Sequence, residues 1–449
     1  MCHQTAIKRV VIIGAGVIGL CTGYYLAKRG YQITLLDQAD PDYQGCSFGN
    51  AGMIVPSHFV PLAAPGMVGM ALRMMLNSRS PFYIRPRLDR ELIDWGLKFY
   101  RAATAQNVER SAPLLRDLNM ASRACYEQLA EIPGNDFGLV REGLLMLCKT
   151  PKGLEEEVHA AGEAFRLGIP AIILDKRQLA AREPGIAMDV AGAVYFPMDC
   201  HLSPGRLMAV LRKSLEEMGA AFRWNTCISE WRTNNGTIEA AGAGNGEEFE
   251  ADEYILCGGS WSPGIVRALG LKLPMQPGNG YSLTLPKPHH LPRSCAILTE
   301  ARVAVTPMGQ TLRFGGTMEM SGLNHEIRRN RVEGIIRSIP AYYPQFTPDD
   351  FAGIIPWCGL RPCSPDGLPY IGRTRAWKNL AIATGHAMMG ISLGPITGKL
   401  VAQLIAGEQS EIDIGLLDPG RFSSFQFSEV SNQKSDVRGQ KSAIRISDP

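Results

Sequence analysis

The chain opens with an uncharged apolar run at residues 10–27, VVIIGAGVIGLCTGYYLA, which closely spaced glycines interrupt. The β-branched start at residues 10–13 predicts a strand, and the pattern at residues 20–28 predicts a helix. A run of this length is also typical of a membrane helix or a signal sequence, but it has no small-residue cleavage site and continues into Lys28. We therefore expect a strand, a tight turn and a helix.

Strand and helix patterns alternate further along the chain. Residues 203–220 predict a helix with Ser203 as its N-cap and Pro204 in its first turn. Residues 379–408 predict a strand, a glycine loop and a helix whose N-terminus we place near Gly394. Further strands are predicted at residues 31–37, 221–230 and 252–258.

A different pattern occupies three segments between these units. Residues 280–286, 301–309 and 311–319 alternate apolar and polar positions. Such alternation is typical of antiparallel strands with one face in water. Mixed helix and strand units together with these segments predict an α/β protein that contains a second, antiparallel sheet.

The first turn carries candidate chemistry, because Gly14, Gly16 and Gly19 have the GxGxxG spacing between a strand and a helix. These glycines allow a tight turn, close approach of a pyrophosphate to the backbone and close packing of the helix on the strand. Asp37 ends the second strand at the position expected for an acid that binds a ribose hydroxyl. The segment predicts a dinucleotide site.

Composition excludes several other classes of protein. The chain has 449 residues, of which 45% are hydrophobic and 20% charged, and its net charge of +3 is too small to suggest a nucleic-acid partner. Its 11 cysteines are odd in number and lack a repeated CxxC spacing. They indicate reduced thiols in the cytoplasm, with neither a disulfide framework nor a metal site.

The loop CSFGNAGMIVP, residues 46–56, follows the second strand and resembles the flavin-contacting loop of the FAD-dependent D-amino-acid oxidase superfamily. The chain is most similar to the bacterial D-amino-acid dehydrogenases of that superfamily. The resemblance runs from Lys8 to about Arg421. It includes the segments EGLLMLCKT, GYSLTLP, GLRPCSPDGLPYIG and TGHAMMGISLGPITGKL in their family order.

The resemblance implies a discontinuous, Rossmann-like FAD-binding domain and an α+β substrate domain built on an antiparallel sheet. The FAD-binding domain would comprise residues 5–60, 200–265 and 350–415, and the substrate domain residues 61–199 and 266–349. The composition of residues 423–449 indicates a disordered tail.

Noncovalent FAD is the expected cofactor, although the residues leave open a bond from Cys295 or Cys358. In the family, the loop before the last helix lies under the flavin, and the backbone at the position of Ile228 meets the adenine. The expected cofactor residues are Gly14, Ala15, Gly16, Val17, Ile18, Gly19, Asp37, Gln38, Ser47, Asn50, Ala51, Gly52, Ile228, Gly258, Gly259, Gly385, Gly390, Ile391, Ser392 and Leu393.

Arg361 stands in the rigid segment GLRPCSPDGLP, at the position of the family's carboxylate-binding arginine. The resemblance implies that it binds the α-carboxylate of an amino acid and directs the Cα–H bond at the flavin, for which a guanidinium fork is suited. The alternative is a structural arginine that pairs with a carboxylate of the chain. We expect Arg361 to be the main substrate-binding residue.

Three further side chains are candidates for the active site. Tyr281 is a candidate for a carboxylate hydrogen bond or a gate, with a packed strand residue as the alternative. His386 is a candidate for contact with flavin or substrate, and a packed, hydrogen-bonded histidine is the alternative. His58 is a weaker candidate, with a surface loop residue as the alternative.

The resemblance implies oxidation of a small D-amino acid, with hydride transfer from Cα to the flavin. The segment AMMGISLGP resembles the branch that acts on D-proline and cis-4-hydroxy-D-proline and forms a pyrroline carboxylate. A glycine or sarcosine type of oxidase and a subunit of an amine-oxidising complex stay open. The expected electron acceptor is a quinone. The apolar residues 60–76 either cover a pocket or contact the inner membrane from the cytoplasmic side.

Overall fold

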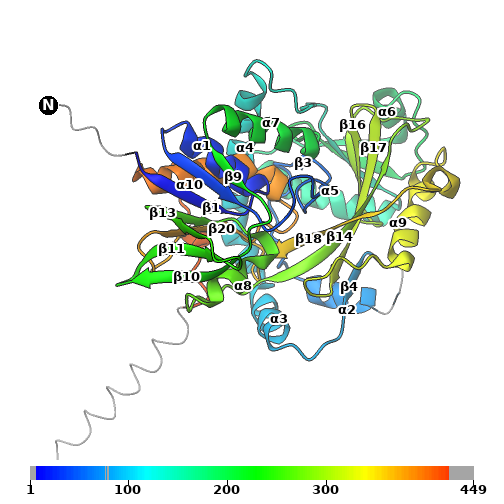
Figure 1. Cartoon of the computed structure of the whole chain (residues 1–449). Helices are drawn as coiled ribbons and strands as arrows, with labels where there is room; N and C mark the ends of the chain where they lie inside the picture. The colour runs from blue at the N-terminus through cyan, green and yellow to red at the C-terminus, as the bar shows by residue number, and fades with distance from the viewer. Residues whose placement is uncertain (1–6, 76, 78–79, 424–449) are drawn as a thin grey trace, which may run out of the picture.

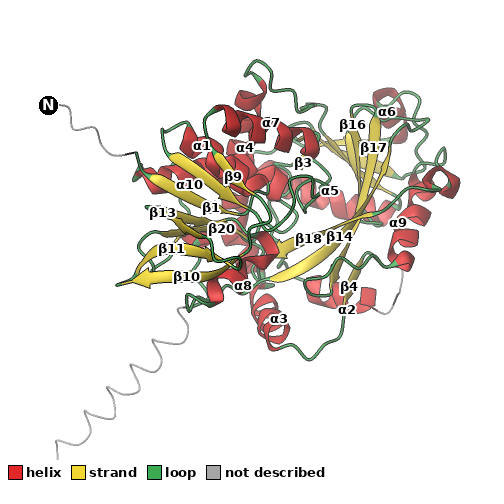
Figure 2. Ribbon diagram, in the orientation of Figure 1, coloured by secondary structure: helices red, strands yellow, loops and turns green. Residues whose placement is uncertain are grey.

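The computed structural model describes residues 7–75, 77 and 80–423, and the predicted tail from residue 424 onward lies outside this part. Two sheets dominate the fold (Figures 1 and 2). The six-stranded sheet has the order β19-β20-β13-β1-β2-β9, and all its neighbouring strands are parallel except β19 and β20. Its strands are β1 (Arg9–Ile13), β2 (Gln32–Leu36), β9 (Ala221–Arg223), β13 (Glu253–Leu256), β19 (Tyr370–Arg373) and β20 (Leu380–Thr384).

Four helices pack in a layer beside this sheet. The helix α1 lies against α7 and α10, and α4 lies against α10. Their apolar side chains form one core with residues of β1, β2, β13 and β20. The bounds are α1 (Val17–Ala27), α4 (Ala105–Ala130), α7 (Pro204–Glu217) and α10 (Gly390–Ala406).

The second large sheet has nine strands in the order β18-β14-β17-β16-β15-β5-β7-β6, and β4 pairs with β17. Its long strands β14, β16, β17 and β18 are antiparallel, and the alternating pattern predicted this for β14, β16 and β17. The strands are β4 (Phe82–Ile84), β5 (Leu144–Cys148), β6 (Ile172–Leu174), β7 (Gly192–Phe196), β14 (Gln276–Leu285), β15 (Cys295–Leu298), β16 (Val303–Met308), β17 (Thr311–Met320) and β18 (Trp357–Cys363).

The remaining elements connect or cover these sheets. A three-stranded sheet contains β10 (Ile228–Asn234), β11 (Thr237–Ala243) and β12 (Glu248–Glu250). A two-stranded sheet contains β3 (Met53–Ile54) and β8 (Cys200–His201). The other helices are α2 (Met67–Met75), α3 (Arg90–Ala102), α5 (Pro151–Arg166), α6 (Lys176–Arg182), α8 (Ser262–Arg267) and α9 (Arg329–Tyr342), with short 3-10 turns at Gly259–Trp261, Pro348–Phe351 and Gly415–Leu417. Within the described ranges, we find no helix long and apolar enough to cross a membrane.

The structure differs from the sequence-based expectations at several strands. Nearly every residue of β14 is buried, so the expected wet face is wrong: residues of α9 cover one face and the loop at residues 46–52 lies near the other. The predicted strand at residues 221–230 is divided into β9 and β10, because Asn225 adopts a positive φ of 54° between them.

Strand β18 pairs with β14, so Arg361 lies in the nine-stranded sheet although we assigned residue 350 onward to the cofactor domain.

The last helix also begins earlier than expected. The helix α10 starts at Gly390 rather than near Gly394, so Pro395 lies inside the helix. Proline has no N–H group and therefore leaves the carbonyl of Ile391 without its helical donor. The hydroxyl of Tyr126 in α4 donates to this carbonyl at 2.5 Å. A side chain from a distant helix thus compensates for a proline next to Gly394, where we expected the helix to start.

Candidate active site

The glycine loop lies at the carboxyl edge of the six-stranded sheet. Since β1, β2, β13 and β20 are parallel, the segments that follow them meet at one edge, where open α/β sheets bind their ligands. The expected cofactor residues in these four segments, from Gly14, Asp37, Gly258 and Gly385 onward, are therefore brought together. This arrangement matches the sequence-based interpretation of a dinucleotide site.

The three glycines of the motif have different surroundings. A Cβ on Gly14 would lie 2.4 Å from the carbonyl oxygen of Cys257, and one on Gly19 would lie 1.8 Å from that of Gly14. A Cβ on Gly16 would meet only Ser47 Oγ, at 3.5 Å. Packing of the protein explains the first two glycines, whereas Gly16 borders open space at the N-terminus of α1. This open position fits the pyrophosphate of a dinucleotide.

Asp37 and Ser47 line the same loop. Asp37 Oδ2 accepts a hydrogen bond from the backbone N–H of Ala15 at 2.7 Å, and Ser47 Oγ accepts one from Val17 N–H at 3.1 Å. The carboxylate therefore fixes the turn that would hold the phosphates, in addition to its expected role toward ribose. Ile228 is the first residue of β10 and is buried. Gln38 lies beside Cys227 at the exposed rim.

The loop at residues 46–52 connects the two sheets. Asn50 Nδ2 donates to the carbonyl of Met388, which precedes α10. Gly52 has a positive φ of 71°, and a Cβ there would lie 2.2 Å from the carbonyl oxygen of Leu202. Ala51 packs beside the apolar cluster that contains Cys295. The loop therefore has a defined shape between the expected cofactor segments.

Sequence reasoning missed Arg313, which holds this loop from β17. Its Nη1 donates to the carbonyls of Phe48 and Asn50, both at 2.8 Å, and its Nε donates to Thr284 Oγ1 at 3.0 Å. Burial lowers the pKa of Arg313 to about 10. The signal in the sequence is a single cation within the otherwise uncharged strand segment TLRFGG.

The first turn of α10 contains Gly390, Ile391, Ser392 and Leu393, which we had placed in a loop. Ser392 is buried; its Oγ accepts from Val55 N–H at 3.0 Å and donates to Asn119 Oδ1 at 2.6 Å. These bonds position α10 against α4 and the segment after β3. Around Gly390, a Cβ would meet no atom closer than 4.0 Å. The open side of this turn stays our expected site for the flavin ring.

Arg361 lies on β18, close to two expected cofactor segments, the loop that begins at Cys46 and the turn at His386. Its Nη1 donates to the carbonyl of Thr317 at 2.5 Å, and its guanidinium covers Gly280, where a Cβ would lie 2.2 Å from Arg361 Cζ. Cys46 lies close enough to Arg361 for each to affect the other's pKa. After Arg361, β18 continues to Cys363, which forms a β-bridge with His386.

The guanidinium of Arg361 lacks a carboxylate partner. Across the described ranges, no Asp or Glu forms an ion pair with it, and burial lowers its pKa. The alternative of a structural arginine paired with a carboxylate is therefore not what the structure shows. A desolvated guanidinium without a counterion favours binding of an anion.

Thr317, which holds Arg361, has an unusual backbone. Its φ is +68°, in the left-handed region that a β-branched residue rarely adopts. The register of β14 and β17 shifts there, so that residues of β17 bulge out opposite Gly280. The bulge directs the carbonyl of Thr317 at Arg361. Strain of this kind is often found at functional sites.

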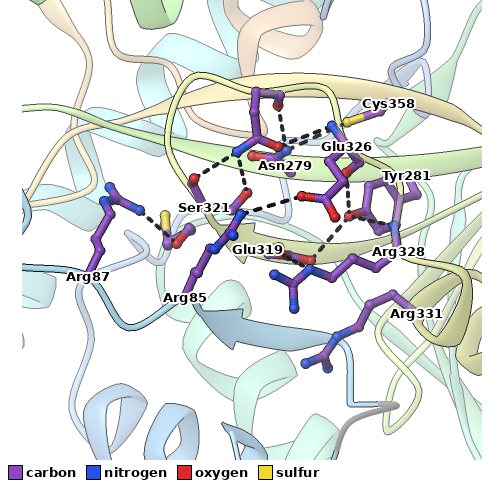
Figure 3. A network of polar contacts seen from close by, with 12 residues as sticks. Arg85, Arg87, Asn279, Tyr281, Glu319, Ser321, Glu326, Arg328, Arg331 and Cys358 are labelled. Atoms are coloured by element: carbon purple, nitrogen blue, oxygen red, sulfur yellow. Dashed lines mark hydrogen bonds and ion pairs between the residues drawn. The ribbon is translucent and has the colours of Figure 1, made fainter.

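Tyr281 lies on the opposite face of β14 from Arg361. It pairs with Cys358, whereas Arg361 pairs with Gly278, and odd-numbered spacing along a strand places side chains on opposite faces. Figure 3 shows the hydroxyl of Tyr281 donating to Glu319, 3.2 Å away, while Glu319 pairs with Arg328 at 2.9 Å. This geometry favours the alternative of a packed strand residue.

Of the two candidate histidines, His386 is buried and His58 is partly buried, and both are neutral at pH 7. His386 Nε2 lies 3.0 Å from Thr397 Oγ1, and burial lowers the pKa of His386 to about 3. His58 Nδ1 lies 3.0 Å from Ser57 Oγ, and burial lowers its pKa to about 4. His58 lies partly buried in the loop after β3. The hydrogen bond of His386 Nε2 agrees with the alternative of a packed histidine. Its Nδ1 has no hydrogen-bond partner in the described chain.

Neither cysteine considered for a covalent bond to FAD faces the expected flavin position. Cys358 faces away from it, and Cys295 lies in the core. Cys358 shares the face of Tyr281, opposite Arg361. Cys295 is fully buried in β15, and its thiol lies 3.4 Å from the carbonyl of Gly143. Burial raises the pKa of both thiols, to about 11 for Cys358. Noncovalent binding stays our prediction.

The glycine loop, the parallel sheet and Arg361 on an adjoining antiparallel sheet define a dinucleotide-dependent oxidoreductase. Residues 9–404 match the family model described as FAD dependent oxidoreductase. The chain belongs to this family, and FAD is its cofactor.

Similar proteins agree with this assignment. The D-amino acid dehydrogenase of Methylobacterium radiotolerans is 33% identical over 424 residues, which cover 92% of this chain and 100% of that protein. The D-amino acid dehydrogenase of Agrobacterium fabrum is 33% identical over 425 residues, with 92% and 100% covered. Glycine oxidase from Geobacillus kaustophilus has a TM-score of 0.73 at 24% identity, covering 92% of this chain and 99% of that one. L-proline dehydrogenase from P. horikoshii has a TM-score of 0.69 at 16% identity, covering 93% and 98%. The two structures support the fold alone.

Proposed function

We propose that this enzyme dehydrogenates a small D-amino acid and that Arg361 binds the substrate's α-carboxylate. The observation that carries the proposal is the guanidinium of Arg361, which is desolvated, fixed by Thr317 and without a carboxylate partner among the described residues. Relatives named D-amino acid dehydrogenase over 92% of the chain support the substrate class. A bidentate pair with Arg361 would fix the orientation of the substrate.

The protein's part in the reaction is binding and orientation. When bound, FAD supplies the acceptor for the hydride that leaves the substrate's Cα. The segments around Gly16, Asp37 and Gly390 would hold it. His386 and His58 have lowered pKa values and no charge at neutral pH, so neither adds a cation beside the substrate's amine. We propose that the amine loses its proton on binding and that no dedicated base is required.

The finer proposal concerns a cyclic substrate. The segment AMMGISLGP supports D-proline or cis-4-hydroxy-D-proline, with a pyrroline carboxylate as the product. An imine formed from an acyclic amino acid would instead hydrolyse to a keto acid and ammonia. A glycine or sarcosine type of oxidase remains the second candidate, because the glycine oxidase fold is shared over 92% of this chain.

A quinone is the electron acceptor that we propose. No residue of α2 is buried, and Leu72 on α2 is exposed together with Ile93 and Tyr100 on α3. This apolar surface supports a peripheral contact with a membrane, where quinones are dissolved. The same helix also covers a cavity, as our other interpretation of residues 60–76 predicted.

Anaerobic bleaching of the purified yellow enzyme tests the proposal. Cis-4-hydroxy-D-proline, D-proline, D-alanine, glycine, sarcosine and the L-forms of the chiral amino acids are added one at a time, and the visible flavin absorption is followed before and after air is admitted. We expect bleaching by D-forms only, fastest with the cyclic compounds, and slow recovery in air. A soluble quinone should restore the absorption quickly.

Each other outcome has a defined meaning. Preference for D-alanine would retain a D-amino-acid dehydrogenase and remove the cyclic substrate. Bleaching only by glycine or sarcosine, with fast recovery in air, would establish an oxidase. A lack of bleaching by every compound, in a preparation that contains FAD and is bleached by dithionite, would overturn the amino-acid assignment.

A further inference from the structure

A cavity of about 680 Å³ lies beneath α2 and α9, next to the bulge of β17. Strand β16 pairs with β17 up to Gly315, and β4 pairs with it from Met318 onward. Gly316 and Thr317 therefore have no partner strand along this edge of β17. The cavity opens at this gap and is lined by Thr317 together with residues of α2 and α9 and by Ser80 and Pro81, which precede β4.

Arg331 of α9 lines the cavity and has half of its guanidinium unused. Its Nη1 donates to the carbonyl of Ser80 at 2.5 Å, to Ser80 Oγ at 3.1 Å and to the carbonyl of Asn77 at 3.4 Å. The side chain is only 3% exposed, yet its buried Nε has no hydrogen-bond partner in the described chain, and no bond from Nη2 is formed there either. The buried Nε is shielded from a ligand, whereas Nη2 forms no hydrogen bond within the described residues and is the nitrogen that can donate to a carboxylate.

The positive charge of Arg331 is not neutralised by the described residues. Glu319 is close enough to affect the pKa of Arg331, but its carboxylate pairs with Arg328 at 2.9 Å and accepts the hydroxyl of Tyr281 (Figure 3). Arg73 of α2 also lines the cavity and forms no ion pair within the described ranges. No Asp or Glu is among the described residues of the lining. Two cations therefore face a cavity that contains no counterion of the chain.

The rest of the lining is mostly apolar. Met70 and Met74 of α2 lie on one side, and Val303 and Ile335 on the other. Such walls favour a ligand with a hydrocarbon body, and flexible methionines adapt to its shape. The cations would bind one charged end of that ligand.

We propose that this cavity is a second anion site, which binds a small carboxylic acid with an apolar body by its carboxylate on Arg331. Arg73 adds attraction at the mouth, and the methionines of α2 cover the hydrocarbon part. The site is separate from the proposed substrate site, because Arg331 and Arg361 belong to different elements and contact different atoms. It does not depend on the role proposed for Arg361.

The two sites share one residue. Thr317 lines the cavity, and its carbonyl accepts the hydrogen bond from Arg361. A ligand in the cavity is therefore expected to change the KM of the amino-acid substrate without competing with it. Thr317 has a strained backbone, so a small shift there alters the position of the guanidinium.

Isothermal titration of the FAD-loaded enzyme with hexanoate tests the proposal, with hexylamine as the probe of opposite charge. We expect hexanoate to bind both the natural enzyme and the Arg361→Ala variant, and hexylamine to bind neither. Arg331→Met should weaken hexanoate binding about tenfold or more, the loss expected for a charge-assisted pair. Arg337→Met is the matched control, since Arg337 is exposed on the same helix and does not line the cavity.

A second variant covers the case in which Arg331→Met fails to fold. Arg73 is exposed, so Arg73→Met should fold normally and weaken hexanoate binding severalfold. Absence of hexanoate binding to the natural enzyme would overturn the proposal. So would binding that Arg361→Ala abolishes, or that the amino-acid substrate displaces, because the probe would then occupy the substrate site. Unchanged affinity in Arg73→Met and in every folded Arg331 variant would overturn it as well.

Discussion

Three neighbours fix the guanidinium of Arg361. The carbonyl of Thr317 accepts one of its hydrogen bonds, Gly278 pairs with its backbone, and Gly280 leaves the space in which the guanidinium lies. The prolines around Arg361 in the sequence predicted a rigid position, and the strand pairing with β14 provides it. Because no Asp or Glu of the described residues pairs with this fixed guanidinium, it is suited to bind the carboxylate of a ligand.

Replacing Arg361 with alanine should weaken substrate binding and leave the flavin in place. Loss of a charge-assisted pair predicts a KM raised about tenfold to a hundredfold. The measurements are steady-state kinetics and the FAD content of the purified protein. Arg85→Ala, on an exposed ion pair with Glu326, is the control and should behave like the natural enzyme. Loss of FAD from Arg361→Ala, with the control unaffected, would return Arg361 to a structural role.

Gly280→Ala tests the position of the guanidinium without removing its charge. The new methyl group would lie 2.2 Å from Arg361 Cζ, so the guanidinium must move. We expect a raised KM with normal FAD content, measured in the same assays. Gly162→Ala in α5 is the matched control, because a Cβ there meets no atom within 4 Å. This control should be neutral or more stable by about 0.5–1 kcal/mol. An unchanged KM in Gly280→Ala would show that the position of Arg361 is not critical.

The turn between β1 and α1 could be predicted from local sequence, whereas the start of α10 could not. The glycine spacing predicted the turn correctly, since each strand-to-helix connection of this type needs the same geometry. The start of α10 was wrong, because Pro395 is tolerated inside the helix only when Tyr126 supplies the missing hydrogen bond. That donor comes from another helix, and local sequence contains no sign of it.

Substitutions in the turn after β1 should separate folding from cofactor binding. Gly14 has a φ of +108°, and its Cβ would collide with Cys257, so Gly14→Ala should destabilise even the FAD-free protein. Gly16 has a φ of −69°, and its Cβ would meet only Ser47. Gly16→Ala should therefore retain the melting temperature of the FAD-free protein and bind less FAD. Equal FAD affinity in Gly16→Ala and the natural protein would argue against pyrophosphate at this turn.

Across the whole molecule, the sequence predicted the two sheets better than the contacts between them. Alternation identified β14, β16 and β17, but the expected wet face was wrong because α9 packs over these strands, and the alternation within a strand does not reveal which element covers it. Arg313 was missed for a related reason. Its partners, the carbonyls of Phe48 and Asn50, are backbone atoms of a distant loop and have no signature in the sequence.

Three histidines with lowered pKa values should make the folded protein sensitive to acid. Burial lowers the pKa values of His58 and His201 to about 4 and that of His386 to about 3. The unfolded chain then binds more protons than the folded one below about pH 6.5, so stability falls as the pH is lowered toward 4. Buried Asp199, with a pKa raised to about 7, has the opposite effect in this range.

The melting temperature between pH 7 and pH 4.5 measures this effect. His201→Gln should lose fewer degrees than the natural protein over that interval, because one titrating group is gone. His159→Gln, on the exposed surface of α5, should match the natural protein. An identical pH dependence in all three proteins would mean that His201 is not held neutral by the fold.

Trp357 joins the two halves of the molecule. A Cβ on Gly49 would lie 2.1 Å from its ring and one on Gly359 2.0 Å from it, and its Nε1 donates to the carbonyl of Gln44. The indole thus occupies the space that two missing side chains leave between the loop at residues 46–52 and the strand of Arg361. A side chain larger than glycine at position 49 or 359 would displace the indole, so the three positions constrain one another and set the separation between the loop and the strand that carries Arg361.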